Sequence, residues 1–166
     1  MPANAGIRTN SRSLLSGLLA ILVVAAAASL SSLATSPNTA LWYGELKKPW
    51  FIPPSPVFGA VWTVLYVLMA FAFWRIASGP SETPGWRLAI RLFLAQLAFN
   101  VVWSFLFFGA HSPLMALIDI VARWLLIVAT IAAFWPLDRP AALALVPVVA
   151  WIAFGIVLNV AIWRLN

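Results

Sequence analysis

The residues from Leu41 to Tyr66 read LWYGELKKPWFIPPSPVFGAVWTVLY and connect two long apolar stretches of the chain. Four prolines, at positions 49, 53, 54 and 56, lie within this connector. Each proline fixes its own φ and pushes the preceding residue toward extended backbone, so we expect a semi-rigid segment. Aromatic side chains beside the prolines, such as Trp42 and Trp50, favour either the lipid headgroup layer or the mouth of a pocket. The connector is therefore predicted to form a lid over one end of a helical bundle.

The composition is that of a membrane protein. Hydrophobic residues make up 64% of the 166 positions and charged residues only 8%, whereas about a quarter of the residues in soluble domains are charged. Five apolar segments of about 20 residues each match a bilayer hydrocarbon core of roughly 30 Å. Because backbone groups in lipid must be hydrogen-bonded within the segment, these segments are predicted to be helices. The expected fold is all-α, a polytopic five-transmembrane-helix bundle.

The predicted layout is an N-terminal tail over residues 1–13 and a single transmembrane domain over residues 14–166. Its helices are expected at 14–34, 56–77, 86–108, 113–135 and 140–163, with a lid loop at 35–55. The first helix follows two arginines and also fits a cleaved signal peptide, although its length favours a membrane helix. Pro56, Pro113 and Pro140 fall where helices begin, where proline is tolerated, while Pro147 lies inside the fifth segment and should bend it.

Basic residues indicate an orientation. Alternate connectors lie on opposite sides of the membrane, so one side collects Arg8, Arg12, Arg75, Arg87, Arg91 and Arg139, and the other collects Lys47, Lys48 and Arg164. This bias predicts a cytoplasmic N-terminus for the integral membrane protein, which we expect to be bacterial. The net charge of +6 does not indicate nucleic-acid binding, because such binding requires clustered Lys and Arg residues.

The chain lacks the residues that metal sites and hydrolase active sites require. The chain has no cysteine, one histidine, His111, and four acidic residues: Glu45, Glu82, Asp119 and Asp138. No His, Asp and Glu cluster offers the three or four ligands of a metal site, and no nucleophile-elbow sequence accompanies His111. We therefore expect no metal and neither a hydrolase nor a metalloenzyme.

Polar and aromatic residues recur at helical spacing on three predicted helices. The three sets are Gln96, Asn100 and Trp103; Trp151, Gly155 and Asn159; and Trp62 and Tyr66. Residues three or four apart share one helix face. If the three faces converge, they form a cavity walled by aromatic rings and amides, which suits a large flat ligand. The alternative is structural, since amides in membrane helices also bridge neighbouring helices and tryptophans also mark the membrane interface.

Asp119 and Arg123 form the sharpest local pair. They lie four residues apart within the fourth predicted helix, where they can neutralise one another in a medium that penalises isolated charge. The pair fits a proton or ion relay. With no further ionisable residue nearby in the sequence, a structural ion pair or a polar anchor between helices is the favoured interpretation.

From about Leu41 to Asn166, the chain resembles the tryptophan-rich sensory protein and translocator protein family. An ordered set of residues carries the resemblance: Trp42, Tyr43, Leu46, Lys48, Pro49, Trp50, Pro53, Pro54, Trp62, Thr63, Leu65, Tyr66, Gln96, Leu97, Asn100, Trp103, Phe107, Phe108, Gly109, Pro147, Trp151, Leu158, Asn159, Leu165 and Asn166. The resemblance implies a five-helix bundle, commonly a homodimer, whose cavity binds porphyrins and other tetrapyrroles, with sterols in some members.

The resemblance also implies roles for particular residues. Trp42 and Trp50 belong to the lid, while Trp62, Tyr66, Asn100, Trp103, Trp151, Gly155 and Asn159 belong to the cavity or its support. No cofactor is required, and the tetrapyrrole is a ligand. Some bacterial relatives are reported to promote light- and oxygen-dependent porphyrin breakdown, and Trp62 and Trp151 match the tryptophans implicated there.

The sequence departs from the family pattern at several positions. Val148 follows Pro147 where a tyrosine is usual, Gly155 replaces a usual alanine, and Arg123 is an unusual charge. After Leu158 the chain offers Trp163 and Arg164 rather than a tyrosine before a basic residue, which argues against sterol binding. The leading hypothesis is a membrane tetrapyrrole-binding sensor or regulator. A light- and oxygen-dependent porphyrin-degrading photo-oxidase and a tetrapyrrole or sterol transporter are the alternatives, and the sparse charged path disfavours the transporter.

Overall fold

The computed structural model describes residues 5–39 and 42–166, with side chains from position 11 onward except position 12. Its elements are α1 (Ala5–Thr39), α2 (Trp42–Glu45), α3 (Ser55–Ser78), α4 (Trp86–Ser104), the π-helical turn η1 (Phe105–Gly109), α5 (Pro113–Phe134), α6 (Arg139–Ala144) and α7 (Val146–Leu165). Within the described residues, five helical stretches are long and apolar enough to cross a membrane: Ser13–Thr39, Ser55–Ser78, Trp86–Gly109, Pro113–Phe134 and Arg139–Leu165. The predicted all-α bundle of five membrane helices is confirmed.

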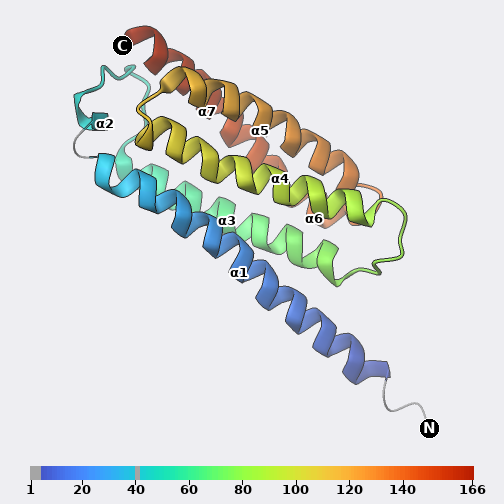
Figure 1. The fold of residues 1–166 in the computed structure, drawn as a ribbon. Coiled ribbons are helices and arrows are strands. Elements are labelled where there is room, and N and C mark those ends of the chain that lie inside the picture. The colour runs from blue at the N-terminus through green and yellow to red at the C-terminus, as the bar shows by residue number, and fades with distance from the viewer. Residues whose placement is uncertain (1–4, 40–41) are drawn as a thin grey trace.

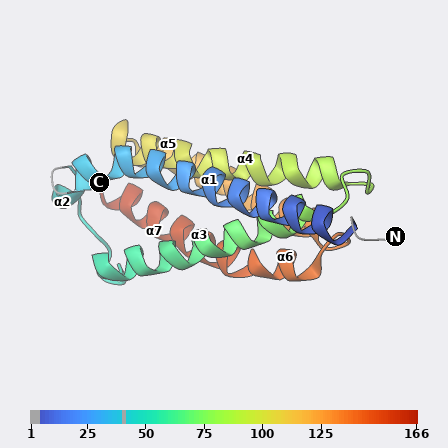
Figure 2. The same ribbon diagram turned by 90° about the horizontal axis from the view of Figure 1, so that it is seen from below.

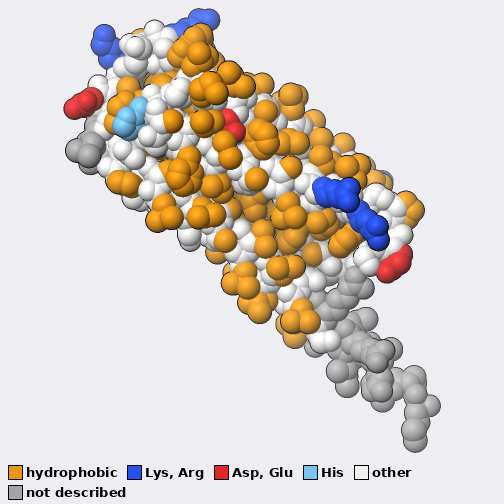
Figure 3. Space-filling view, viewed as in Figure 1, with side chains coloured by type: hydrophobic (Ala, Val, Ile, Leu, Met, Phe, Trp, Pro, Cys, Tyr) orange, Lys and Arg blue, Asp and Glu red, His pale blue; other side chains and the backbone are white. Residues whose placement is uncertain are grey.

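The long helices lie side by side in an elongated bundle (Figures 1 and 2). α1 packs against α3 and α4, and α5 packs against α4 and α7. The C-terminus and α2 lie at one end of the bundle, and the α3–α4 and α5–α6 connections lie at the other. Hydrophobic side chains cover the middle of the face shown in Figure 3, and most charged side chains lie toward its two ends. This distribution fits a bilayer around the middle of the bundle.

Helix ends differ from the predicted ones. The first helix extends from Ala5 to Thr39, so most of the expected tail is helical and the loop at 35–55 starts later and contains the short helix α2. Residues 1–4 of that tail and 40–41 of that loop lie outside the described residues, as do the side chains of Arg8 and Arg12. The third helix changes to a π turn after Ser104. Hydropathy marks the span but does not fix helix ends, which depend on capping and packing.

Prolines act as expected at the helix starts. Proline occupies the first turn of α3, α5 and α6, where its missing N–H removes no hydrogen bond. Side chains add caps, since the Ser112 hydroxyl accepts from the Met115 amide at 3.4 Å and Asp138 Oδ1 accepts from the Ala141 amide at 2.8 Å. In the fifth span the helix is interrupted at Leu145, two residues before Pro147. The expected bend therefore appears as a break between α6 and α7.

Stacked phenylalanines fill the centre of the bundle. Phe93 of α4 is fully buried and stacks on Phe73 of α3 at 4.8 Å between ring centroids and on Phe134 of α5 at 6.1 Å. α1 contributes small buried residues such as Ala20 and Val24 to the same core. These contacts fix the relative positions of α3, α4 and α5 before any polar group is considered.

An ion pair closes the end of the bundle that lies away from α2. Arg75 of α3 donates to Asp138 from Nε at 3.0 Å and from Nη2 at 2.7 Å. Partial burial opposes ionisation of Asp138, but hydrogen bonds from Arg75 and from the Ala141 amide outweigh it and hold the pKa of this carboxyl below its usual value. The carboxylate thus joins α3 to the start of α6.

Candidate functional site

A polar cluster joins α3 and α4 in the interior of the bundle. Asn100 of α4 is 2% exposed, and its Nδ2 donates to the Tyr66 hydroxyl of α3 at 2.9 Å. The Tyr66 ring lies 5.5 Å from the ring of Trp62, one turn earlier on the same helix. Two of the three predicted faces therefore meet, and they meet through a hydrogen bond.

A second polar contact joins α4 to α7. The Trp103 indole N–H donates to Asn159 Oδ1 at 3.1 Å, and Asn159 Nδ2 donates to the Pro113 carbonyl at 2.8 Å. Asn159 is buried, and Trp103 stacks on Phe107 of the π turn at 5.1 Å. Because Trp103 and Asn159 hydrogen-bond to each other, they bridge neighbouring helices, which is the structural role that the sequence also allowed for these residues.

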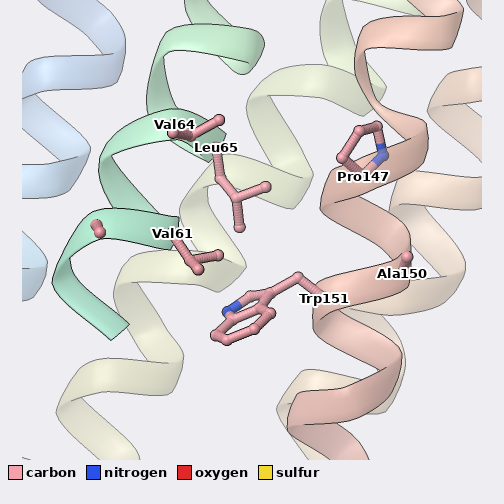
Figure 4. A pocket seen from close by; sticks show the side chains of 7 residues that line it. Val61, Val64, Leu65, Pro147, Ala150 and Trp151 are labelled. Carbon is pink, nitrogen blue, oxygen red and sulfur yellow. The ribbon is translucent and has the colours of Figure 1, made fainter. Parts of the chain in front are cut away.

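A groove opens between α3 and α7. Its volume is about 590 Å³, and its walls are Ala60, Val61, Val64, Leu65, Pro147, Ala150 and Trp151. Figure 4 shows the Trp151 indole reaching from α7 toward α3 below Val61. The walls are apolar and four of them are exposed on the outer surface of the bundle, so a ligand can enter from the lipid. A hollow of this size is within the range of small-molecule sites.

Aromatic rings extend the wall of the groove toward the lid. The Trp151 ring lies 5.7 Å from that of Phe58 on α3 and 5.4 Å from that of Phe154 on α7. No described residue accepts a hydrogen bond from the indole N–H of Trp151 or of Trp62, in contrast to Trp103. The sequence analysis overlooked Phe58, although its spacing of four before Trp62 places it on the same helix face.

Gly155, the remaining predicted residue on α7, marks a close approach between helices. A Cβ built there would lie 3.1 Å from Ile120 Cδ1 of α5. The glycine therefore permits tight packing of α7 on α5 rather than contacting the groove, whose walls do not include it.

The lid packs on the end of the bundle through aromatic rings. Trp42 and Tyr43 of α2 contact Phe107 at 5.5 and 6.1 Å, and the Trp42 ring stacks on His111 at 4.5 Å. Burial raises the pKa of the Tyr43 hydroxyl above its ordinary value. Trp50, at the tip of the lid, is 94% exposed. The two predicted lid tryptophans therefore differ, since Trp42 anchors the lid and Trp50 projects from it.

The C-terminal residue fixes the lid backbone. Asn166 Oδ1 accepts from the Lys47 amide at 2.9 Å, and Asn166 Nδ2 donates to the Lys47 carbonyl at 3.1 Å. The amide pairs with the backbone of one residue as a neighbouring strand would. Sequence spacing gave no sign of this contact, because 119 positions separate the two residues.

Asp119 and Arg123 interact electrostatically, as expected, but their side chains do not form a salt bridge. Both side chains are buried, at 6% and 1% exposure, but within the described part of the chain the only ion pair joins Arg75 and Asp138. The Arg123 guanidinium instead lies 5.4 Å from the centroid of the Trp62 ring. Spacing of four makes a pair possible on a helix, but the side-chain rotamers decide whether it forms.

No metal site is apparent in the described part of the chain, where no three His, Cys, Asp or Glu side chains gather. The interior offers aromatic surface, a few amides and hydroxyls, one guanidinium and the buried Asp119 carboxylate. Aromatic surface with a few hydrogen-bonding groups is suited to binding a flat apolar ligand.

Fold and site together define a five-helix membrane protein with an apolar groove walled in part by Trp151 and an aromatic lid on one end of the bundle. Residues 19–164 match the model of the TspO/MBR family. The chain is 39% identical over 132 residues to the tryptophan-rich protein TspO of Chlorobaculum tepidum, covering 79% of this chain and 84% of the relative. It is 40% identical to the tryptophan-rich sensory protein of Cereibacter sphaeroides, covering 75% and 77%, and 36% identical to the human translocator protein, covering 75% of each. The chain belongs to the TspO/MBR family.

Proposed function

We propose that this protein is a membrane tetrapyrrole-binding sensor or regulator, and that its ligand enters the groove between α3 and α7. The observation that carries the proposal is the groove itself, which is apolar, open toward lipid and walled on one side by the Trp151 indole. A flat, largely apolar pigment dissolved in the bilayer matches these walls. One relative is named a tryptophan-rich sensory protein, which agrees with a regulatory role.

The polar groups supply orientation rather than catalysis. The unpartnered N–H groups of Trp62 and Trp151 lie on α3 and α7, the two helices that form the groove. The Asn100 amide holds the Tyr66 hydroxyl at 2.9 Å and so fixes the position of the Tyr66 ring beside Trp62. Phe51 of the lid contacts Phe154 at 6.4 Å, which connects the lid to the wall of the groove. Ligand binding is expected to stabilise the lid, and an altered lid is a surface that a partner can recognise.

Titration with protoporphyrin IX in detergent, followed by quenching of tryptophan fluorescence, tests the proposal. Binding should saturate at a fixed stoichiometry. Trp151→Phe removes the indole N–H at the groove and Asn100→Leu releases Tyr66, so each should weaken binding by about two- to tenfold, the value of one net hydrogen bond. Trp135→Phe is the matched control, because Trp135 is 45% exposed at the far end of α5. Equal affinity in all four proteins contradicts the proposed site.

A further inference from the structure

Arg123 is the largest fully buried side chain of the described structure and lies in the middle of α5. Its Nε and Nη2 atoms are buried and have no hydrogen-bond partner. The Trp62 ring covers its guanidinium carbon at 5.4 Å. A buried guanidinium without an anion is costly in a protein interior and more so inside a membrane. Arg123 therefore has buried donors that no described residue uses.

Asp119, one turn earlier on α5, acts electrostatically on Arg123 but forms no salt bridge with it. Asp119 Oδ2 is itself buried without a partner, and no oxygen of Asp119 lies within 4.0 Å of a described basic nitrogen. Asp119 and Arg123, one helical turn apart, thus each keep buried polar atoms without a hydrogen-bond partner.

Arg75 shows what the open edge of Arg123 is suited to hold. In Arg75, the edge formed by Nε and Nη2 holds both oxygens of the Asp138 carboxylate at 2.7 to 3.0 Å. In Arg123, the same two atoms are the unpartnered ones. The two donors on this edge are spaced to match the two oxygens of a carboxylate.

Position links this edge to the proposed ligand. Trp62 follows Val61, a wall of the groove, by one residue on α3, and its ring lies 5.5 Å from the Tyr66 ring and 5.4 Å from the guanidinium carbon. Trp62 thus lies over the guanidinium and comes from a helix that walls the groove. A carboxylate on a flexible side chain of a ligand reaches the guanidinium if the Trp62 ring turns aside.

We infer that Arg123 is a specificity-determining residue that pairs with a carboxylate carried by an apolar ligand of the α3–α7 groove. The inference rests on the proposed function and narrows the ligand to acidic tetrapyrroles over neutral ones. A fatty acid carries the same group on a different apolar body, so the test separates these two sources of carboxylate.

The test compares protoporphyrin IX, a dicarboxylic acid, with its dimethyl ester on the purified full-length protein, on Arg123→Met and on Arg91→Met. Met matches the length of the apolar stem without the charge, and Arg91 is an exposed arginine. We expect wild type and Arg91→Met to bind the acid about ten- to a hundredfold more tightly than the ester, the value of a charge-assisted pair. In Arg123→Met the preference should fall to about one, with ester affinity unchanged.

Competition with oleate separates the two carboxylate sources. Displacement of protoporphyrin IX only at far higher oleate concentration supports the tetrapyrrole, whereas displacement at equal concentration overturns the narrowing to tetrapyrroles. An acid-to-ester ratio that is the same in wild type and Arg123→Met overturns the inference but leaves porphyrin binding intact. Absence of binding of both porphyrins to wild type overturns the inference and the proposed function together.

Thermal unfolding separates the inferred role from a structural one. Without ligand, Arg123→Met should match or exceed wild type in melting temperature, because it removes a buried charge whose Nε and Nη2 have no hydrogen-bond partner. If Arg123 serves only to neutralise Asp119, Arg123→Met should melt lower, and the double variant with Asp119→Asn should recover. That result would count against a ligand-receiving role.

Discussion

Replacing Asn159 by leucine is expected to destabilise the bundle through the loss of two specific contacts. Asn159 bridges three parts of the structure, since it accepts from Trp103 at 3.1 Å on α4 and donates to the Pro113 carbonyl at 2.8 Å at the start of α5. It is 2% exposed, so water cannot replace either contact. Leucine has the same branching at Cγ but is larger, so the double-mutant cycle with Trp103→Phe, rather than the single variant, separates the hydrogen bond from the packing.

The magnitude follows from the number of contacts. Hydrogen bonds between membrane helices average about 0.6 kcal/mol and reach about 1.7 kcal/mol. Two of them place the expected loss in the free energy of unfolding at about 1–3 kcal/mol. In a double-mutant cycle with Trp103→Phe, the coupling energy between the two positions should be about 0.6–1.7 kcal/mol.

Equilibrium unfolding in mixed micelles of SDS and dodecyl maltoside, followed by far-ultraviolet circular dichroism, measures these quantities without relying on tryptophan signals. The control cycle pairs Asn159→Leu with Trp135→Phe, which lies at the other end of α5, and these two changes should be additive within about 0.5 kcal/mol. A coupling energy of zero between Trp103 and Asn159 would refute the bridge and return both residues to the ligand site.

Three further outcomes are expected. Asp138→Asn keeps the side-chain cap of α6 but loses the charge paired with Arg75. Thermal melts should show that wild type loses about 0.5–1 kcal/mol of stability relative to this variant as the pH falls from 7 through the lowered pKa of Asp138. A stability difference that stays constant across this pH range would contradict the ion pair. Asn166→Ala frees the Lys47 backbone, and hydrogen exchange in the lid should accelerate about fivefold or more while α4 stays protected. Under illumination in oxygen, the bound porphyrin should bleach no faster than free porphyrin in the same detergent; faster bleaching that Trp151→Phe abolishes would favour the photo-oxidase.

Sequence reasoning located the polar and aromatic residues of the interior but not their partners. The spacing of Trp62 and Tyr66 placed them on one face of α3, and the spacing of Asn100 and Trp103 did the same on α4. That Asn100 bonds to Tyr66 while Trp103 bonds to Asn159 depends on how α4 is rotated between α3 and α7. Helical periodicity defines a face but not the neighbour that the face contacts.

Arg123 shows why local rules fail inside the bundle. On an isolated helix, a residue four positions after an aspartate is its natural partner. In the folded chain, the guanidinium lies over an indole from another helix, a contact between residues 61 positions apart. Cation–π attraction and packing around Arg123 compete with the local pair, and only the assembled helices bring the indole into range.

The amino-acid sequence by itself determined the membrane class, the number and rough position of the five spans, the prolines of the lid and the residues available for binding. Each of these depends on hydropathy, on proline geometry or on the identity of side chains, which are local properties of the chain. Only the tertiary structure revealed the groove between α3 and α7, the hydrogen bonds of Asn166 to the lid backbone and the unpartnered Nε and Nη2 atoms of Arg123. These depend on the lateral order and rotation of the helices, and hydropathy carries little information about either because lipid tails and apolar side chains are equivalent neighbours for an apolar face.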